Sequence, residues 1–135
     1  MNMQDLAIRF SDTSSYDGFT FDVQLIPGEV EVLQVVVGEF EELPVYVSIT
    51  DSQLLCIVYL WTEAEVDPKT RVEMLETMLE VNIPMPLSSF SKIGEHYAVF
   101  GAMSLNSSFD EIVHEVAVLA ENSVDAITAM EGFLV

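Results

Sequence analysis

Three side chains carry the nucleophilic or general-base groups that catalysis most often uses: Cys56, His96 and His114. A cysteine becomes a nucleophile when a nearby histidine and carboxylate activate its thiol. These three residues fall on different predicted elements, and a zinc site would need further Cys or His ligands. The sequence therefore predicts no catalytic residue, no cofactor-binding residue, no metal ligand and no enzyme. The alternative is a small-molecule or metal-binding enzyme that uses Cys56, His96 or His114.

Two groups of carboxylates, at residues 39–42 and 63–67, are the other candidates for chemistry. Calcium takes about six to eight oxygen ligands in a loop shaped by a glycine turn. Neither group has that spacing, so we interpret both as solvated acidic surface. The sequence also lacks a phosphate-binding glycine loop and a dinucleotide fingerprint.

The charge balance restricts the partners of this protein. The chain has 23 Asp and Glu residues against four Lys and Arg, with a formal net charge of -19, yet half of its residues are hydrophobic. Such a chain folds around an apolar core and places its carboxylates outside. Nucleic acids and anionic membranes are disfavoured, because basic residues must neutralise their phosphates. The acidity serves solubility, or it steers a basic protein partner.

The length of 135 residues fits one domain spanning residues 1–135. The single Cys56 cannot form an internal disulfide, which suits a reducing compartment. The start of the chain lacks the features of a signal peptide. The longest apolar run, residues 54–61, is too short to cross a bilayer. We therefore expect a cytoplasmic protein without membrane insertion.

Hydrophobic periodicity predicts the order α-β-β-β-β-α-β-β-α. Strands are expected over residues 19–25, 30–37, 43–49, 54–61, 89–93 and 96–103, and helices over residues 3–10, 67–82 and 108–130. The second strand changes phase, which indicates a bulge or burial of both faces. This order defines an α+β fold in which helices pack on an antiparallel sheet of five to six strands.

Caps and apolar stripes define the last two helices. Asp67 and Pro68 are predicted to open the middle helix, whose apolar stripe is Val72, Leu75, Met78 and Leu79. Ser108 and Glu111 have the spacing of a capping box. Gly101 lies inside a strongly predicted strand. A glycine there indicates that a helix or an aromatic ring packs over it, or that it lines a binding groove.

The final helix carries a second stripe of small apolar residues beside its main one: Val113, Ala117, Ala120 and Val124. One stripe suffices to cover a sheet. The second stripe therefore packs beside another helix of the chain, or it forms a homodimer or partner surface together with an exposed sheet edge.

Several segments resemble the YjfI-like family of bacterial proteins of unknown function: residues 86–90, 97–104, 107–108 and 119–122. That family has no established activity, so the resemblance implies no catalytic residue. Its members often occur near genes for relatives of the phage-shock protein A, which implies such a relative as a partner.

The element order is also similar, more loosely, to type III secretion chaperones and to YbjN-like proteins. This likeness implies a chaperone-like, often homodimeric domain that binds extended segments of other proteins. We therefore expect a non-enzymatic adaptor or chaperone-like interaction module, which forms a homodimer and binds a protein partner.

Overall fold

The structure, a computed structural model, describes residues 2–135. Its helices are α1 (Met3–Asp12), α2 (Arg71–Val81) and α3 (Phe109–Met130), with short 3-10 turns η1 (Glu63–Glu65) and η2 (Glu131–Phe133). Its strands are β1 (Phe21–Ile26), β2 (Val32–Val37), β3 (Val45–Ile49), β4 (Leu54–Thr62), β5 (Ser89–Ile93) and β6 (His96–Met103). The predicted α+β class and the predicted order of the main elements are confirmed.

All six strands form one antiparallel sheet in the order β1-β2-β3-β4-β6-β5. The first four strands follow the chain as hairpins. The connection through α2 then crosses over, so that β6 pairs with β4 and β5 forms the far edge. The two edge strands of the sheet are therefore β1 and β5.

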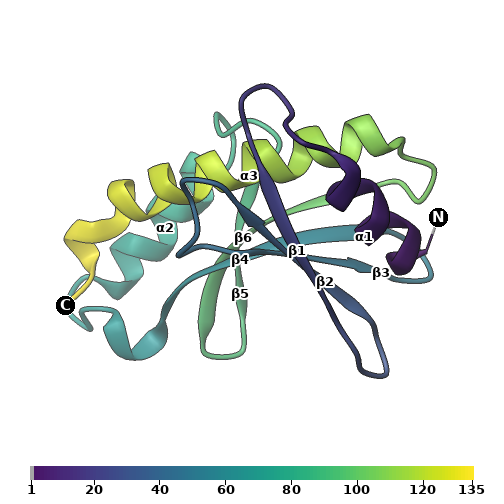
Figure 1. Ribbon diagram of the computed structural model, residues 1–135. Helices are drawn as coiled ribbons and strands as arrows, with labels where there is room; N and C mark the ends of the chain where they lie inside the picture. Colours follow the sequence, from purple (N-terminus) through teal and green to yellow (C-terminus); the bar gives the residue numbers. More distant parts are fainter. Residues whose placement is uncertain (1) are drawn as a thin grey trace.

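The helices lie on one side of the sheet, and α3 runs across its strands (Figure 1). Alternate strand residues point to this side and form the core together with the buried faces of α1 and α3. Leu33, Val47, Cys56 and Val99 come from the middle strands, and Leu6 and Leu119 come from the helices. Among residues 2–135, no helix packs on the other side of the sheet (Figure 1).

Two details of the strands differ from the sequence prediction. The change of phase in the second strand is neither a bulge nor a doubly buried segment, because Val30 precedes β2 and is exposed. Within β2, alternation is regular and buries Leu33, Val35 and Val37. The irregular register lies in β4 instead, between Tyr59 and Trp61.

The middle helix starts later than predicted and buries only part of its predicted apolar stripe. Residues 67–70 form a turn in which the Asp67 carboxylate accepts a hydrogen bond from the Lys69 N–H at 3.0 Å, and α2 begins only at Arg71. The helix buries Met74 and Met78, whereas Val72 is 66% exposed and Leu79 is 71% exposed. The apolar residues of this helix spread over about half of its circumference, so spacing alone could not select which part of that arc is buried.

The last helix begins with the predicted capping box. The Ser108 hydroxyl accepts from the Glu111 N–H, and the Glu111 carboxylate accepts from the Ser108 N–H, both at 3.2 Å. No helix within residues 2–135 has the length and apolar character required to span a bilayer.

Candidate functional site

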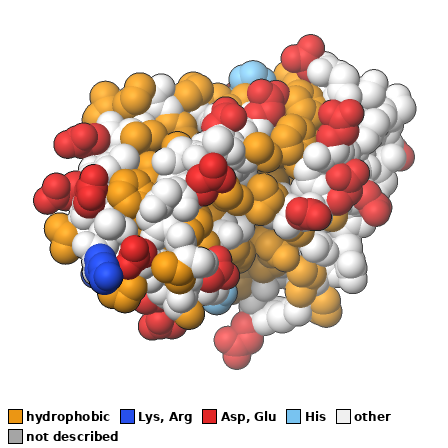
Figure 2. Space-filling view, turned by 90° about the vertical axis from the view of Figure 1, so that its left-hand side faces the viewer, with side chains coloured by type: hydrophobic (Ala, Val, Ile, Leu, Met, Phe, Trp, Pro, Cys, Tyr) orange, Lys and Arg blue, Asp and Glu red, His pale blue; other side chains and the backbone are white. Residues whose placement is uncertain are grey.

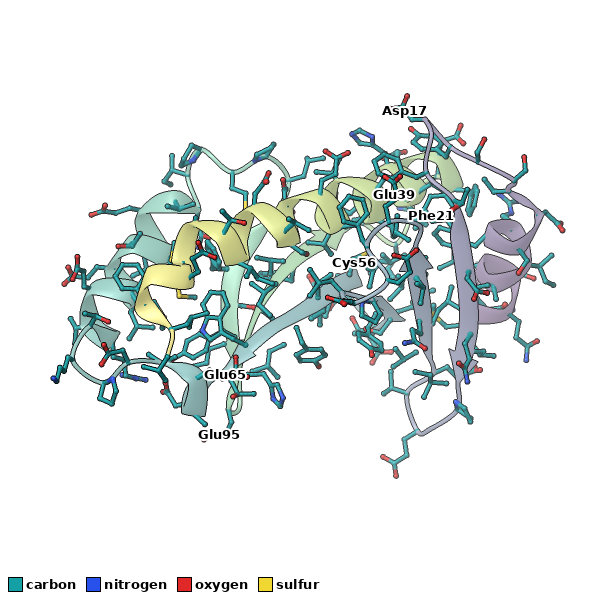
Figure 3. All side chains as sticks on the ribbon, turned by 60° about the vertical axis from the view of Figure 1, so that its left-hand side comes forward. Asp17, Phe21, Glu39, Cys56, Glu65 and Glu95 are labelled. Atoms are coloured by element: carbon teal, nitrogen blue, oxygen red, sulfur yellow. The ribbon has the colours of Figure 1, made fainter. Side chains whose placement is uncertain are left out.

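The structure does not bring Cys56, His96 and His114 together. Cys56 faces the core beneath α3, where it is fully buried (Figure 3). His96 lies on the opposite face of the sheet, with its ring 5.4 Å from the ring of Tyr59, and His114 is exposed on α3. Burial, helped by the charge of Glu115, raises the pKa of the Cys56 thiol far above its ordinary value. Within residues 2–135, no group of three or more His, Cys, Asp or Glu side chains is arranged to hold a metal ion.

Glu115 is a buried carboxylate inside the interface between α3 and the sheet. Its Oε1 occupies the space where residue 101 would place a Cβ if it were not glycine. Burial raises the pKa of Glu115, and the neighbouring His114 opposes this shift. Gly101 therefore lets the helix pack closely over the strand. This agrees with the first of the two interpretations of Gly101, a packed helix or ring, and not with a binding groove.

The predicted small-residue stripe of α3 lies largely inside the molecule. Val113 is 1% exposed, Ala117 is 3% exposed and Ala120 is fully buried, because the helix lies across a twisted sheet with α1 beside it. A partner cannot reach these three side chains while the chain keeps this fold. Val124, which is 41% exposed, is the one member of the stripe on the surface.

Val124 lies in a groove between α3 and the connection from β2 to β3. Two adjoining hollows of about 410 and 360 Å³ share Glu39, Phe40 and Val124. We call this surface the acid-rimmed groove, and its lining residues are Phe19, Glu39, Phe40, Glu41, Glu42, Leu43, Glu121, Val124, Asp125 and Ile127.

The connection beside α3 is held in a compact turn. The Phe40 N–H donates to the Val37 carbonyl at 2.9 Å, and the Leu43 N–H donates to the Phe40 carbonyl at 3.0 Å. Glu39 adopts a left-handed backbone conformation with φ of 75°, and its N–H donates to the Glu41 carboxylate at 3.1 Å. This turn places Glu39 next to α3 (Figure 3).

The floor of the groove is apolar and continuous with the core. Phe19, Phe40, Leu43 and Ile127 are partly buried and pack against core residues. The rings of Phe19 and Phe40 lie 6.2 Å apart. These side chains offer a partner a firm apolar surface that is only partly accessible to water.

The rim of the groove carries uncompensated negative charge. Five of its ten lining residues are Asp or Glu, and none is Lys or Arg. Within residues 2–135, the one ion pair between side chains joins Arg71 to Glu63 at 2.7 Å, away from this rim. Figure 2 shows the same mixture of carboxylates and exposed hydrophobic side chains spread over one face of the molecule.

Sequence reasoning found one residue of this groove, Val124, and missed the rest of it. The carboxylates at residues 39–42 were recognised only as acidic surface. Phe40 interrupts that run of carboxylates and Leu43 follows it, and these apolar residues were the available signal for a binding surface. Their meeting with Glu121 and Asp125 depends on a contact between segments about 80 residues apart, which no local pattern encodes.

These features define an α+β domain with helices on one face of an antiparallel sheet and an acidic, apolar-floored surface groove. The chain belongs to the family described as "uncharacterized protein conserved in bacteria (DUF2170)", whose family model matches residues 1–134. No curated protein sequence matches the chain.

Proposed function

We propose that this protein is a non-enzymatic adaptor or chaperone-like module that binds a basic, amphipathic segment of another protein in the acid-rimmed groove. The observation that carries the proposal is the combination of an apolar floor with five carboxylates that form no ion pair among residues 2–135. Exposed apolar surface rimmed by polar residues is a common mark of a protein-interaction site.

The chemistry of the groove selects its partner. Phe40, Val124 and Ile127 would contact the apolar side of a bound segment, as amphipathic helices do in hydrophobic grooves. Glu121 and Asp125 lie one helical turn apart on α3 and would meet Lys or Arg on the polar side. Complementary charge accelerates such an encounter and excludes acidic segments.

A relative of the phage-shock protein A is the first partner to test. The support is the resemblance of residues 86–90, 97–104 and 119–122 to the YjfI-like family, whose members often occur beside genes for such relatives. The cytoplasm is the proposed compartment for this encounter, since the chain has one cysteine and that residue is buried.

The test measures binding of synthetic Lys- and Arg-rich segments from that partner by calorimetry. We expect the triple variant Glu39→Gln, Glu121→Gln, Asp125→Asn to bind about tenfold more weakly, because each exposed charge pair contributes about 0.2–1 kcal/mol. The matched control is Glu73→Gln, Glu76→Gln, Glu80→Gln on α2, which removes the same charge from exposed positions.

Raising the salt concentration should weaken this binding, since salt screens exposed charges. If the two triple variants lose equal affinity, the net charge of the chain drives binding and the groove does not. If the basic segments do not bind the wild-type chain at low salt, the proposed function is wrong.

A further inference from the structure

We propose that the uncovered side of the sheet is a contact surface for a second copy of this chain. This open sheet face consists of the outward side chains of β2–β6, and six apolar residues form its centre: Val36, Tyr46, Ile57, Tyr59, Ala98 and Phe100. The surface is separate from the acid-rimmed groove, which lies on the helical side.

The strand register gathers these side chains into one patch. Tyr46 on β3 lies opposite Ile57 on β4, and Ile57 lies opposite Phe100 on β6. The rings of Tyr46 and Tyr59 are 5.8 Å apart in an edge-to-face arrangement. Ala98 pairs with Tyr59 and is itself fully buried, so the accessible part of the patch comes from the larger side chains around it.

In the part of the chain that the structure describes, no helix packs over this patch (Figure 1). The helices pack on the opposite side of the sheet, which leaves these strands open (Figure 1). Tyr59 is 41% exposed at the centre of the face. An antiparallel sheet with one open face usually alternates apolar and polar residues, with the polar ones outward. Here β4 directs apolar residues to both sides, which is expected where another surface packs on the open side.

The charge distribution argues for a second copy as the occupant. The chain holds 23 Asp and Glu among 135 residues, yet the outward positions of the described strands β2–β6 hold none. Asp22, on the edge strand β1, lies opposite Val36 and places a carboxylate at the border of the patch. Strands β2–β6 offer a basic partner no anion, whereas two acidic copies can bring these strands together without placing carboxylates of β2–β6 against each other.

The area of the face suits a weak dimer. Strands about 4.8 Å apart and about 17 Å long give five strands a flat area of roughly 350–400 Å² per copy. Side chains make the accessible surface larger than this flat area, so two such faces would bury on the order of 1,000 Å² in total. That value lies at the low end of the total area buried in specific protein interfaces. A twofold axis would place the same patch on both sides of the contact.

Net charge opposes this association, since each copy carries a formal charge of -19. Salt screens that repulsion, so dimerisation should strengthen as salt rises. Binding of a basic segment in the acid-rimmed groove should weaken under the same change. The two proposals therefore respond to salt in opposite directions and can fail independently.

The experiment is sedimentation equilibrium on the full chain at low and at high sodium chloride, over protein concentrations from micromolar to about millimolar. We expect a dimer whose dissociation constant falls by at least about tenfold between the two salt conditions. Tyr59→Glu should be monomeric in high salt, because it places carboxylates face to face. Tyr59→Ser adds no charge and should weaken the dimer by about tenfold. This variant replaces Tyr59→Glu in the test if the glutamate variant does not fold.

The matched control is Leu79→Glu on α2, which adds the same charge at an exposed apolar residue of the helical side and should leave the dimer intact. A wild-type chain that stays monomeric at every concentration and salt would overturn the proposal. A dimer that persists in Tyr59→Glu would also overturn it. Loss of the dimer in Leu79→Glu would do the same, because it would show that the contact involves α2.

Discussion

Glu115 on α3 fills the space that a side chain at Gly101 on β6 would need. The Glu115 Oε1 lies on the position of the missing Cβ, and the Leu87 carbonyl oxygen is 3.2 Å from the same point. Gly101 pairs with Cys56 in the sheet, so the helix, both strands and the 82–88 connection meet here. The close approach of α3 to the sheet depends on this glycine.

Replacing Gly101 with alanine should therefore destabilise the fold. The added methyl group would force the Glu115 carboxylate aside, and overpacking of this kind costs about 1–3 kcal/mol. The free energy of unfolding from urea titration measures the loss. Gly132→Ala is the control, because nothing lies within 4 Å of its Cβ position.

A double-mutant cycle assigns that cost to the Glu115 contact. In the Gly101→Ala background, Glu115→Ala should restore part of the lost stability, because it empties the space that the methyl group needs. If the two substitutions simply add, the clash with Glu115 is not the cause of the destabilisation.

Burial of Glu115 should make stability depend on pH in a defined direction. Its pKa is raised in the folded state by desolvation, so the folded chain binds a proton more tightly than the unfolded chain. The linked contribution to stability is then complete below the ordinary pKa of 4.5 and is lost as pH rises through the folded value. Neutral glutamine removes this dependence.

Unfolding free energies of the wild type and Glu115→Gln, compared between pH 4.5 and pH 8, test this sign. We expect the variant to gain stability relative to the wild type as pH rises. The exposed Glu73→Gln variant corrects for the general charge of the chain. A difference that stays constant with pH, or that shrinks toward pH 8, would contradict the raised pKa of Glu115.

How much of the structure could be predicted depends on how far apart along the sequence the interacting residues lie. Alternation in β1 and β3 and the Ser108 cap depend on neighbouring residues, and these were predicted correctly. The buried side of α2 was predicted only in part, because Met78 of the predicted stripe is buried whereas Val72 and Leu79, which fit helical spacing equally well, are exposed. Met74, which the predicted stripe left out, is buried. Only the tertiary fold decides between such faces.

The open sheet face shows the same difference between local patterns and tertiary contacts. The apolar residues on both sides of β4 were visible in the sequence, and they led us to predict a central strand. Whether a helix or open space lies over Ile57 and Tyr59 depends on the crossover through α2, which also places β6 beside β4. Strand order of this kind has no local signal, so the open sheet face could not be predicted.

Cys56 should react slowly with thiol reagents in the folded protein. It is fully buried, and burial together with Glu115 raises its thiol pKa far above neutrality, so little thiolate exists to react. A central strand opens only with a large share of the unfolding free energy, about 5 kcal/mol or more. Labelling in native buffer should then be about a thousandfold or more slower than in concentrated urea. Rapid labelling of the folded chain would instead favour the alternative of a Cys56 nucleophile.

The capping box of α3 should contribute to stability without influencing the acid-rimmed groove. Ser108→Ala removes the hydroxyl that accepts the Glu111 N–H, and loss of such a cap costs about 0.5–2 kcal/mol. Ser108→Asn keeps an acceptor at the same position and should retain most of the stability. Urea midpoints with unchanged slopes measure both effects. Glu121 and Val124 lie about three to four turns further along α3, so binding of a basic segment should be the same in both variants. Equal losses for alanine and asparagine would show that the hydroxyl acts through a contact other than the cap.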